Sequence, residues 1–341
     1  MTTIREIAAK AGYSAASVSR LLNNDPTFSI SDSARNKILE TAQTLNYKKN
    51  STTTHDKYNI AVIFAILPQK ELEDVYYSNL RQSVVNYAKK TNMSLTFYLE
   101  ISDVPAEVDG VLAIGQFQSA DLELLSAYSS TCIFIDSNPD SHKFSSVQPN
   151  LESIIEQAIK LFIQDGFESI GFIGGSLWHA NEIPTRLKDP RQKYIESYLR
   201  ELGLLNQDLI HIGSDFSIKT GYSLGNEIIT NLSRQPLPNG FIIASDLLAV
   251  GVLQAFNEHG ISVPNDTAII SINDIDIVKY TSPPLTTFKI DTDQLAKTAI
   301  NTLKDNIIFP VSTHKNILLD ADIVYRQSFL QSYPDSFKII I

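Results

Sequence analysis

The chain has little of what builds disulfide-linked, membrane-spanning or metal-binding proteins. Its one cysteine in 341 residues, Cys132, lies in the apolar stretch 131–136 and is expected to pack as a small core residue. No apolar run is long enough to span a bilayer, and the N-terminus lacks a signal-peptide pattern. The six histidines are scattered, without the spacing of metal ligands. We therefore expect a cytoplasmic protein with no metal, no cofactor and no membrane contact.

Positive charge is also scarce, because the net charge of the chain is −10. The charge is unevenly divided between the two ends. Residues 1–57 carry 8 Lys and Arg against 5 Asp and Glu, a net +3, whereas the remainder carries 20 against 33, a net −13. This division predicts that only the N-terminal part contacts nucleic acid, and that its modest charge requires two such parts to act together.

The first 45 residues predict three short helices. Thr3 and Glu6 have the spacing of a capping box, Gly12 ends the first helix, Ser14 caps the second, and Ser31 begins the third. Apolar residues recur at helical spacing along all three, and these are Ile4, Ile7, Ala8, Ala11, Val18, Leu21, Leu22, Ala34, Ile38, Ala42 and Leu45. Helices this short need a shared core, so a compact helix-turn-helix unit is expected.

The outer face of the second helix carries small, hydroxylic or cationic residues: Ser14, Ala15, Ala16, Ser17 and Arg20. Small residues let a helix backbone approach the bases in the major groove, while hydroxyls and an arginine bind phosphate or a guanine edge. The same pattern also fits a helical hairpin with a solvated polar face. The pattern alone leaves both interpretations open.

The strings "TIREIAAKAGYSAASVSRLLN" and "ILETAQTLNY" resemble the DNA-binding head of the LacI/GalR family of bacterial repressors. The resemblance favours DNA binding and implies that Ala15 and Ala16 occupy the main base-reading positions. An alanine offers only its methyl group, for instance to a thymine methyl, so these two residues do not define the operator. The full expected DNA-contacting set is Thr3, Ser14, Ala15, Ala16, Ser17, Ser19, Arg20, Asn23, Lys48 and Lys49.

Residues 48–59 (KKNSTTTHDKYN) are polar, rich in Ser and Thr, and without periodicity, which predicts a linker. Members of the resembled family usually carry here a short helix with an Ala-Arg-x-Leu pattern, whose leucine enters the minor groove. That pattern is absent from this chain. We expect a flexible tether from which Lys48 and Lys49 contact phosphate.

From Tyr58 onward, apolar strands alternate with amphipathic helices in two series of similar size, which predicts two α/β lobes built on doubly wound parallel sheets. The resemblance extends over both lobes, which look like the periplasmic-binding-protein fold with three crossovers, near residues 147–150, 288–291 and 310–318. The expected segments are a helix-turn-helix domain at 1–47, a linker at 48–59, a two-lobed domain at 60–330 (lobe 1 about 60–147 and 291–310; lobe 2 about 148–288 and 318–330) and a tail at 331–341.

Polar and aromatic residues lie at the ends of the expected strands and at the starts of helices, where two facing lobes form a cleft. Carboxylates, an amide and an arginine bind vicinal hydroxyls, and an aromatic ring covers the C–H face of a sugar. Asp246 equally fits a helix N-cap, and Tyr76 and Tyr77 equally fit core packing. The resemblance places Asp136, Arg191, Phe216, Ser245 and Asn273 on effector positions, with Asn273 replacing an acidic residue common there. The expected effector-binding set is Tyr76, Tyr77, Asp136, Arg191, Phe216, Ser245, Asp246 and Asn273.

Stretches such as "ELEDVYYSNLRQSV" and "IIASDLLAVGVLQAFNEHGISVPND" are most similar to the evolved-β-galactosidase repressor and Gram-positive galactose repressor branch of that family. This similarity implies a homodimeric, sequence-specific repressor of sugar-utilisation genes that binds double-stranded operator DNA and is relieved by galactose or a β-galactoside. Ligand action as a corepressor is physically equivalent and stays open. No leucine heptad follows Phe329, so no tetramerising helix is expected.

Three other functions fit parts of the sequence. The main alternative is a catabolite-control regulator whose corepressor is a phosphorylated phosphocarrier protein; a secreted sugar-binding protein would lack the DNA-binding head. An enzyme is not expected, because Ser176, His179 and Asp189 lack the Gly-x-Ser-x-Gly turn of a hydrolase, and the glycines at 171, 174 and 175 lack the dinucleotide-binding fingerprint.

Overall fold

The computed structural model describes residues 3–22, 28, 30–45, 57–66, 74–177, 188–309 and 313–330. The chain divides into two compact units, Met1–Lys57 and Tyr58–Ile341, called here the head and the body. Asn23, Lys48, Lys49, most of the expected linker and the tail at 331–341 lie outside the described residues.

The head consists of three helices, α1 (Ile4–Ala11), α2 (Ala15–Leu22) and α3 (Asp32–Thr44), in agreement with the sequence prediction. The capping box at the start of α1 is confirmed: the Thr3 hydroxyl accepts from the Glu6 amide, and the Thr3 amide donates to the Glu6 carboxylate at 2.8 Å. Gly12 ends α1 with a φ of +77°. The shared core is also as predicted and contains Ile7, Ala8, Ala11, Val18, Ile38 and Ala42.

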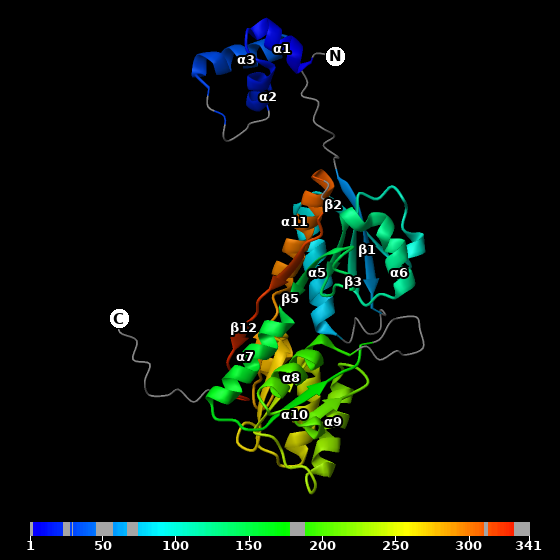
Figure 1. Ribbon diagram of the computed structural model, residues 1–341, viewed down its shortest axis with the longest axis vertical. Helices are drawn as coiled ribbons and strands as arrows, with labels where there is room; N and C mark the ends of the chain where they lie inside the picture. The colour runs from blue at the N-terminus through cyan, green and yellow to red at the C-terminus, as the bar shows by residue number, and fades with distance from the viewer. Residues whose placement is uncertain are drawn as a thin grey trace, which may run out of the picture. The chain divides into compact units, whose positions relative to one another are not determined.

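The body contains two six-stranded sheets, each covered by helices (Figure 1). Sheet 1 defines lobe 1 and has the order β11-β5-β4-β3-β1-β2. Its strands are β1 (Tyr58–Ala65), β2 (Met93–Tyr98), β3 (Gly110–Gly115), β4 (Cys132–Ile135), β5 (Ser145–Pro149) and β11 (Asn316–Leu319). Helices α5 (Val75–Lys90) and α11 (Thr292–Ile308) pack together, while α6 (Ser119–Leu125) contacts the 3₁₀ helices at 101–103 and 126–131.

Sheet 2 defines lobe 2 and has the order β12-β10-β9-β8-β6-β7. Its strands are β6 (Ile170–Gly174), β7 (Ile210–Ile212), β8 (Gly240–Ile243), β9 (Ala268–Asn273), β10 (Thr286–Lys289) and β12 (Asp322–Val324). Helices α7 (Leu151–Gln164) and α8 (Pro190–Glu201) form one packed pair, and α9 (Ile218–Asn231) and α10 (Asp246–Glu258) form another. Short 3₁₀ helices lie at 207–209 and at 276–279, the latter labelled η4. Strand pairing is parallel in both sheets except between β10 and β12.

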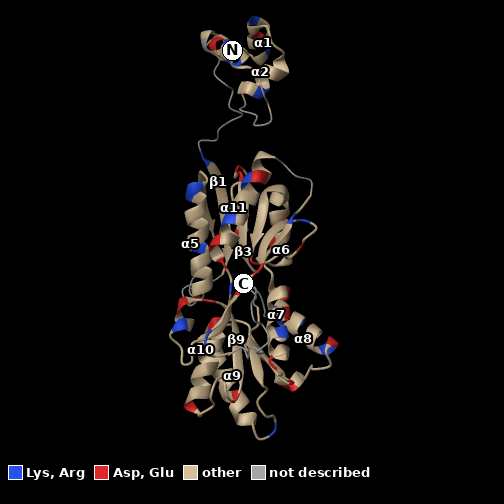
Figure 2. Cartoon of the chain, turned by 90° about the vertical axis from the view of Figure 1, so that its left-hand side faces the viewer, with Lys and Arg blue, Asp and Glu red and all other residues tan. Residues whose placement is uncertain are grey.

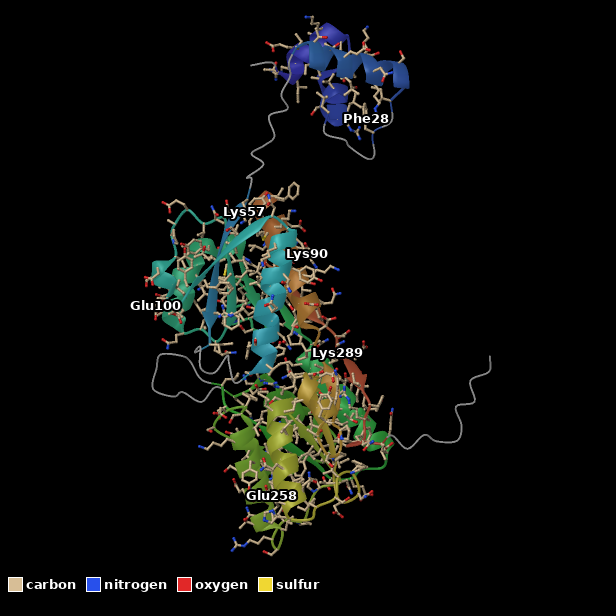
Figure 3. The ribbon with its side chains drawn as sticks, turned by 180° about the vertical axis from the view of Figure 1, so that it is seen from behind. Phe28, Lys57, Lys90, Glu100, Glu258 and Lys289 are labelled. Atoms are coloured by element: carbon tan, nitrogen blue, oxygen red, sulfur yellow. The ribbon has the colours of Figure 1, made fainter. Side chains whose placement is uncertain are left out.

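The chain passes three times between the lobes. Two passages lie where the sequence predicted them, after β5 near Pro149 and after β10 near Lys289, a residue labelled in Figure 3. The third lies between Leu319 and Asp322, later than the predicted 310–318, because residues 316–319 form strand β11 at the edge of sheet 1. This short strand alternates between exposed and half-buried residues, so it has no apolar run to mark it.

Two glycines bring α9 and α10 unusually close together. A Cβ atom on Gly251 would clash with the Ile218 carbonyl oxygen, and one on Gly221 would clash with the Leu248 carbonyl oxygen. The helix pair therefore tolerates no side chain at either position. The contact fixes the spacing between the starts of α9 and α10, and both starts adjoin expected effector residues, Phe216 and Ser245.

Candidate functional site

The outer face of α2 is presented as the sequence predicts. Val18 is fully buried, while Ser14, Ala15, Ala16 and Arg20 are exposed and Ser17 and Ser19 are half-buried. The Ser14 hydroxyl caps α2 by accepting from the Ser17 amide at 3.0 Å. This leaves two alanine methyls at the helix start, where a helix entering the major groove needs little bulk.

Arg20 lies at the other end of this face. Its guanidinium stacks over the ring of Phe28 at 5.0 Å from the ring centroid, and Figure 3 labels Phe28. Stacking of this kind orients the planar guanidinium on the exposed side of α2. Phe28 was not among the residues expected to matter, because an isolated aromatic in a polar loop has no periodicity to reveal its contact.

Lobe 1 contributes a cluster of two tyrosines and one carboxylate. Tyr76 and Tyr77 lie in the first turn of α5, which Asp74 caps, and Asp136 follows β4 in a left-handed conformation with a φ of +71°. The Tyr76 hydroxyl donates to one Asp136 oxygen at 2.6 Å, and the Tyr77 hydroxyl donates to the other at 3.1 Å. These contacts join two segments 60 residues apart and give both tyrosines a polar function beyond core packing.

The electrostatics of this cluster are dominated by burial. Burial raises the pKa of Asp136 from 3.8 to about 6, although the two tyrosine hydroxyls and Arg191 oppose the shift. Burial and the Asp136 charge together raise the pKa values of Tyr76 and Tyr77 well above 10. Arg191 belongs to lobe 2. Its influence on the pKa values of Asp136 and Tyr77 indicates that it faces the tyrosine and carboxylate cluster of lobe 1.

Lobe 2 contributes Arg191, which is held on three sides. Asp189 caps α8, and Pro190 occupies the first turn, so the sequence Asp-Pro-Arg sets the start of the helix. The Arg191 Nε and Nη2 atoms donate to the two Asp189 oxygens at 2.8 and 2.7 Å, and Nη1 donates to the Ala244 carbonyl at 2.6 Å. The guanidinium also lies over the Phe216 ring, 4.8 Å from its centroid.

This arrangement keeps Arg191 charged and immobile. Burial disfavours the guanidinium cation, but the Asp189 carboxylate, together with smaller contributions from Asp136 and Tyr77, outweighs that effect and raises the pKa of Arg191. Sequence reasoning found Arg191 and Phe216 but considered Asp189 only as part of a hydrolase triad. The ion pair with Arg191 occupies the Asp189 carboxylate, and Ser176 donates to the Gly213 carbonyl, whereas His179 lies outside the described residues.

Ser245 and Asp246 occupy the start of α10, directly after β8. The Ser245 hydroxyl is the N-cap, accepting from the Leu248 amide at 3.4 Å. Asp246 is fully buried and accepts from the hydroxyls of Ser271 and Thr287 and from the Ile275 amide. Burial raises the pKa of Asp246 from 3.8 to about 7. Effector contact by these two residues stays a prediction, because their polar atoms are already engaged within the protein.

Asn273 ends β9, the neighbour of β8 in sheet 2. Its side chain is half-buried, and its backbone has a φ of +123°. Ser245 and Asn273 therefore both lie at the carboxyl ends of neighbouring parallel strands, β8 and β9. Arg191 is attached at the same end of the sheet, because it donates to the Ala244 carbonyl. Ligand contact by Asn273 also stays a prediction.

The part of the chain that the structure describes contains no group of three or more His, Cys, Asp or Glu side chains able to hold a metal ion. None of its helices is both long and apolar enough to cross a membrane. Lys, Arg, Asp and Glu residues are scattered over the helices of the body (Figure 2).

Comparison with known proteins gives independent matches to both units. The model for bacterial regulatory proteins of the lacI family matches residues 3–50, and the model for a periplasmic binding protein-like domain matches residues 159–329. The HTH-type transcriptional regulator GanR of Bacillus subtilis (strain 168) is 39% identical over 331 residues, covering 96% of this chain and 99% of GanR.

One further relative and one solved structure are also similar to the chain. The HTH-type transcriptional regulator LacR of Lactobacillus helveticus is 36% identical over 335 residues, covering 97% of this chain and 99% of LacR. Among solved structures, a complex of the transcriptional regulator CelR with cellobiose superimposes with a TM-score of 0.67 at 20% identity, covering 96% of this chain and 100% of CelR. At that identity, the superposition shows a shared fold.

Proposed function

Because the chain belongs to the LacI family of bacterial regulatory proteins, we propose that it represses sugar-utilisation genes and releases its operator when a sugar occupies the site between the lobes. The head would bind double-stranded operator DNA in the cytoplasm, with Ala15, Ala16, Ser17, Ser19 and Arg20 toward the major groove. The outward face of α2 and the buried Val18 support this orientation.

The observation that carries the sugar assignment is the geometry of Arg191. Its guanidinium edge is fixed by Asp189 and its face lies on Phe216, while Asp136 with its two tyrosine hydroxyls approaches from the other lobe. An aromatic ring beside charged and neutral hydrogen-bonding groups suits a sugar, which has an apolar C–H face and hydroxyls on its rim. The solved CelR complex with cellobiose has the same fold, which supports a sugar ligand in a body of this kind.

We favour galactose or a β-galactoside as the effector, on the similarity of the chain to galactose repressors. Two chains would form a homodimer whose heads read half-sites about one helical turn apart, ~34 Å. Sugar binding would close the lobes and change the spacing of the heads. A coupling free energy of about 1–3 kcal/mol per site is sufficient for such regulation.

Isothermal titration of the full chain with a panel of mono- and disaccharides tests the effector class. Saturable binding of galactose or a galactoside without turnover supports the proposal and excludes a glycosidase. A phosphorylated phosphocarrier protein serves as a second titrant. If operator affinity rises with that protein and no sugar binds, the chain is instead a catabolite-control regulator.

A further inference from the structure

The loop after β9 has an unusual backbone. Asn273 and Asp274 are consecutive residues with φ values of +123° and +57°, and neither is a glycine. Such conformations are strained for a residue with a side chain and persist where surrounding contacts enforce them. Asn273, an expected effector residue, is the last residue of β9 and directly precedes this loop, so the contacts that enforce the shape of the loop also influence where the Asn273 side chain lies.

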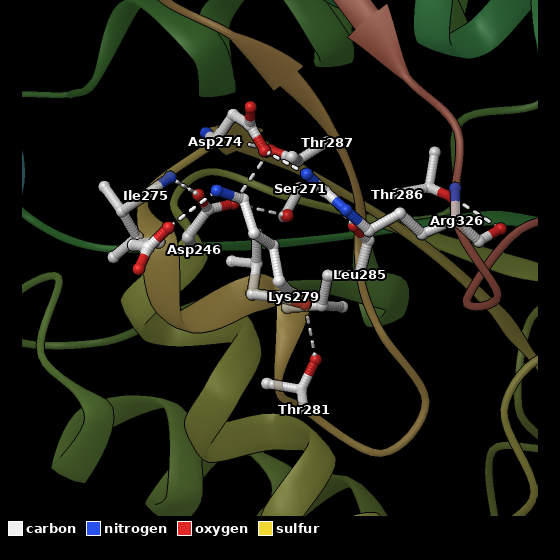
Figure 4. A network of polar contacts seen from close by, with 12 residues as sticks. Asp246, Ser271, Asp274, Ile275, Lys279, Thr281, Leu285, Thr286, Thr287 and Arg326 are labelled. Atoms are coloured by element: carbon white, nitrogen blue, oxygen red, sulfur yellow. Dashed lines mark hydrogen bonds and ion pairs between the residues drawn. The ribbon is translucent and has the colours of Figure 1, made fainter.

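The first enforcing contact is Asp246, at the start of α10 (Figure 4). One of its carboxylate oxygens accepts from the Ile275 amide at 2.8 Å, which holds the far end of the loop. The other oxygen accepts from Ser271 on β9 at 2.5 Å and from Thr287 on β10 at 2.8 Å. One buried carboxylate thus joins a helix, two strands and the loop between them.

The second enforcing contact comes from the end of the chain. Arg326 follows β12, the first strand after the third passage between the lobes. Its Nη2 atom donates to the Asp274 carboxylate at 2.6 Å, and its Nη1 atom donates to the Leu285 carbonyl at 2.8 Å. The Arg326 and Asp274 side chains are only 14% and 10% exposed, so this ion pair is far better shielded than a surface pair.

Thr287 connects the two contacts. Its hydroxyl donates to Asp246 and accepts from the Asp274 amide at 3.3 Å. Both residues that follow Asn273 are therefore held. Asp274 is held through its amide and its carboxylate, and Ile275 is held through its amide. Figure 4 shows these partners converging from β9, β10 and the segment after β12.

We infer that Asp246, Thr287 and Arg326 are positioning residues for the effector site: they hold the strained loop so that Asn273 is preset for the ligand. This inference rests on the proposed sugar-binding function. It predicts that Thr287 and Arg326, which are not among the expected ligand-contacting residues, help to set the sugar affinity, because the ordering of the loop is completed before binding.

The test compares Arg326→Met, which removes the ion pair, and Thr287→Val, which keeps the shape but loses the hydroxyl. Lys279→Met is the matched control, because Lys279 forms an exposed ion pair with Asp276 in the same region, on η4.

The readouts are sugar affinity by isothermal titration, operator affinity without sugar, and amide exchange of Ile275. We expect Arg326→Met and Thr287→Val each to weaken sugar binding about tenfold or more and to speed the exchange of Ile275. Operator affinity should stay within about twofold, Arg326→Lys should regain part of the loss, and Lys279→Met should behave as the unmodified chain.

Unchanged sugar affinity and Ile275 exchange in Arg326→Met and Thr287→Val would overturn the inference. Equal loss of sugar and operator binding would also overturn it, because that result indicates a general loss of folding. If Arg326→Met does not fold, Thr287→Val decides. If the unmodified chain binds no sugar, the proposed function fails, and Ile275 exchange in the variants alone decides whether the loop is held as inferred.

Discussion

The head and the body place their functional residues in opposite ways. In the head, the capping box, the turn and the exposed face of α2 all arise within the first 45 residues, and each depends on residues a few positions apart. In the body, Tyr76 contacts Asp136 in lobe 1, and Arg191 contacts Ala244 in lobe 2. The loop after β9 is held by Asp246 through Ile275 and by Arg326 through Asp274. The proposed DNA-binding residues are therefore placed by local sequence, whereas the proposed ligand-binding residues are placed by contacts between segments far apart in the sequence.

Removing one unit is expected to have the largest effect on function. Deletion of residues 1–57 removes the whole of the head and leaves the body starting at its first strand. We expect operator binding to be abolished and sugar binding to be retained with an unchanged affinity. Gel-shift and isothermal titration of the deleted chain measure both. Residual specific operator binding would contradict the assignment of DNA recognition to the head.

The reverse experiment removes the central cation of the ligand site. Arg191→Ala leaves the buried Asp189 carboxylate without its guanidinium partner and exposes one face of Phe216. We expect sugar affinity to fall about a hundredfold, roughly 2.8 kcal/mol, with operator binding retained, which gives a repressor that sugar does not release.

Lys188→Met is the control for this experiment, because Lys188 pairs with Glu196 nearby and its side chain is 42% exposed. Sugar affinity and release should then be normal. An Arg191→Ala repressor that still leaves the operator at ordinary sugar concentrations would show that the site lies elsewhere.

The division of the chain into two compact units predicts separate effects on their stability. Ile38 is fully buried in the small head core, so Ile38→Ala should destabilise the head by about 2–5 kcal/mol. Differential scanning calorimetry should show a lowered or missing head transition and an unchanged body transition. A shift of both transitions by the same amount would contradict independent folding.

A smaller effect sharpens the role of lobe 1. The pKa of Asp136 is raised to about 6 by burial, with Tyr76, Tyr77, Arg191 and Asp74 as its charged or titratable neighbours. Between about pH 4 and 6, the folded chain therefore keeps a proton on Asp136 that the unfolded chain has released. Proton binding by Asp136 stabilises the folded state at low pH, and this contribution to the free energy of unfolding is lost as the pH rises through that window.

Ligand binding should respond in the opposite direction. If Asp136 accepts from sugar hydroxyls as a carboxylate, sugar affinity should fall several-fold as the pH drops from about 6.5 to 5. Asp136→Asn should flatten the affinity profile in that range, measured by titration at each pH. A profile identical to that of the unmodified chain would remove Asp136 from the site.

Much of the fold followed from periodicity, and the exceptions have physical causes. The helices of the head and the central strands of both sheets were predicted because their apolar spacing reflects one-sided or complete burial. Strands β5, β10, β11 and β12 were not predicted. Strand β11, for example, is an edge strand of four residues, half of them exposed, and has no apolar run. The third passage between the lobes was misplaced for the same reason.

The candidate site was only partly predictable. Asp136 and Arg191 were predicted as candidates because charged residues at strand ends and helix starts line the cleft in folds of this kind. The sequence did not predict the pairing of Arg191 with Asp189. It also did not predict the contact of Arg326 with Asp274, because these partners lie 52 residues apart. Positive φ angles at Asn273 and Asp274 also carried no signal, because glycine, which usually marks them, is absent there.

The most direct test is operator release by sugar in the full chain. Fluorescence anisotropy of a labelled operator, titrated with the sugar that binds most tightly in calorimetry, reports whether ligand occupancy changes DNA affinity. The account predicts a change of at least about fivefold in operator affinity at saturating sugar, equivalent to about 1 kcal/mol of coupling. Saturated sugar binding with an unchanged operator affinity would contradict it.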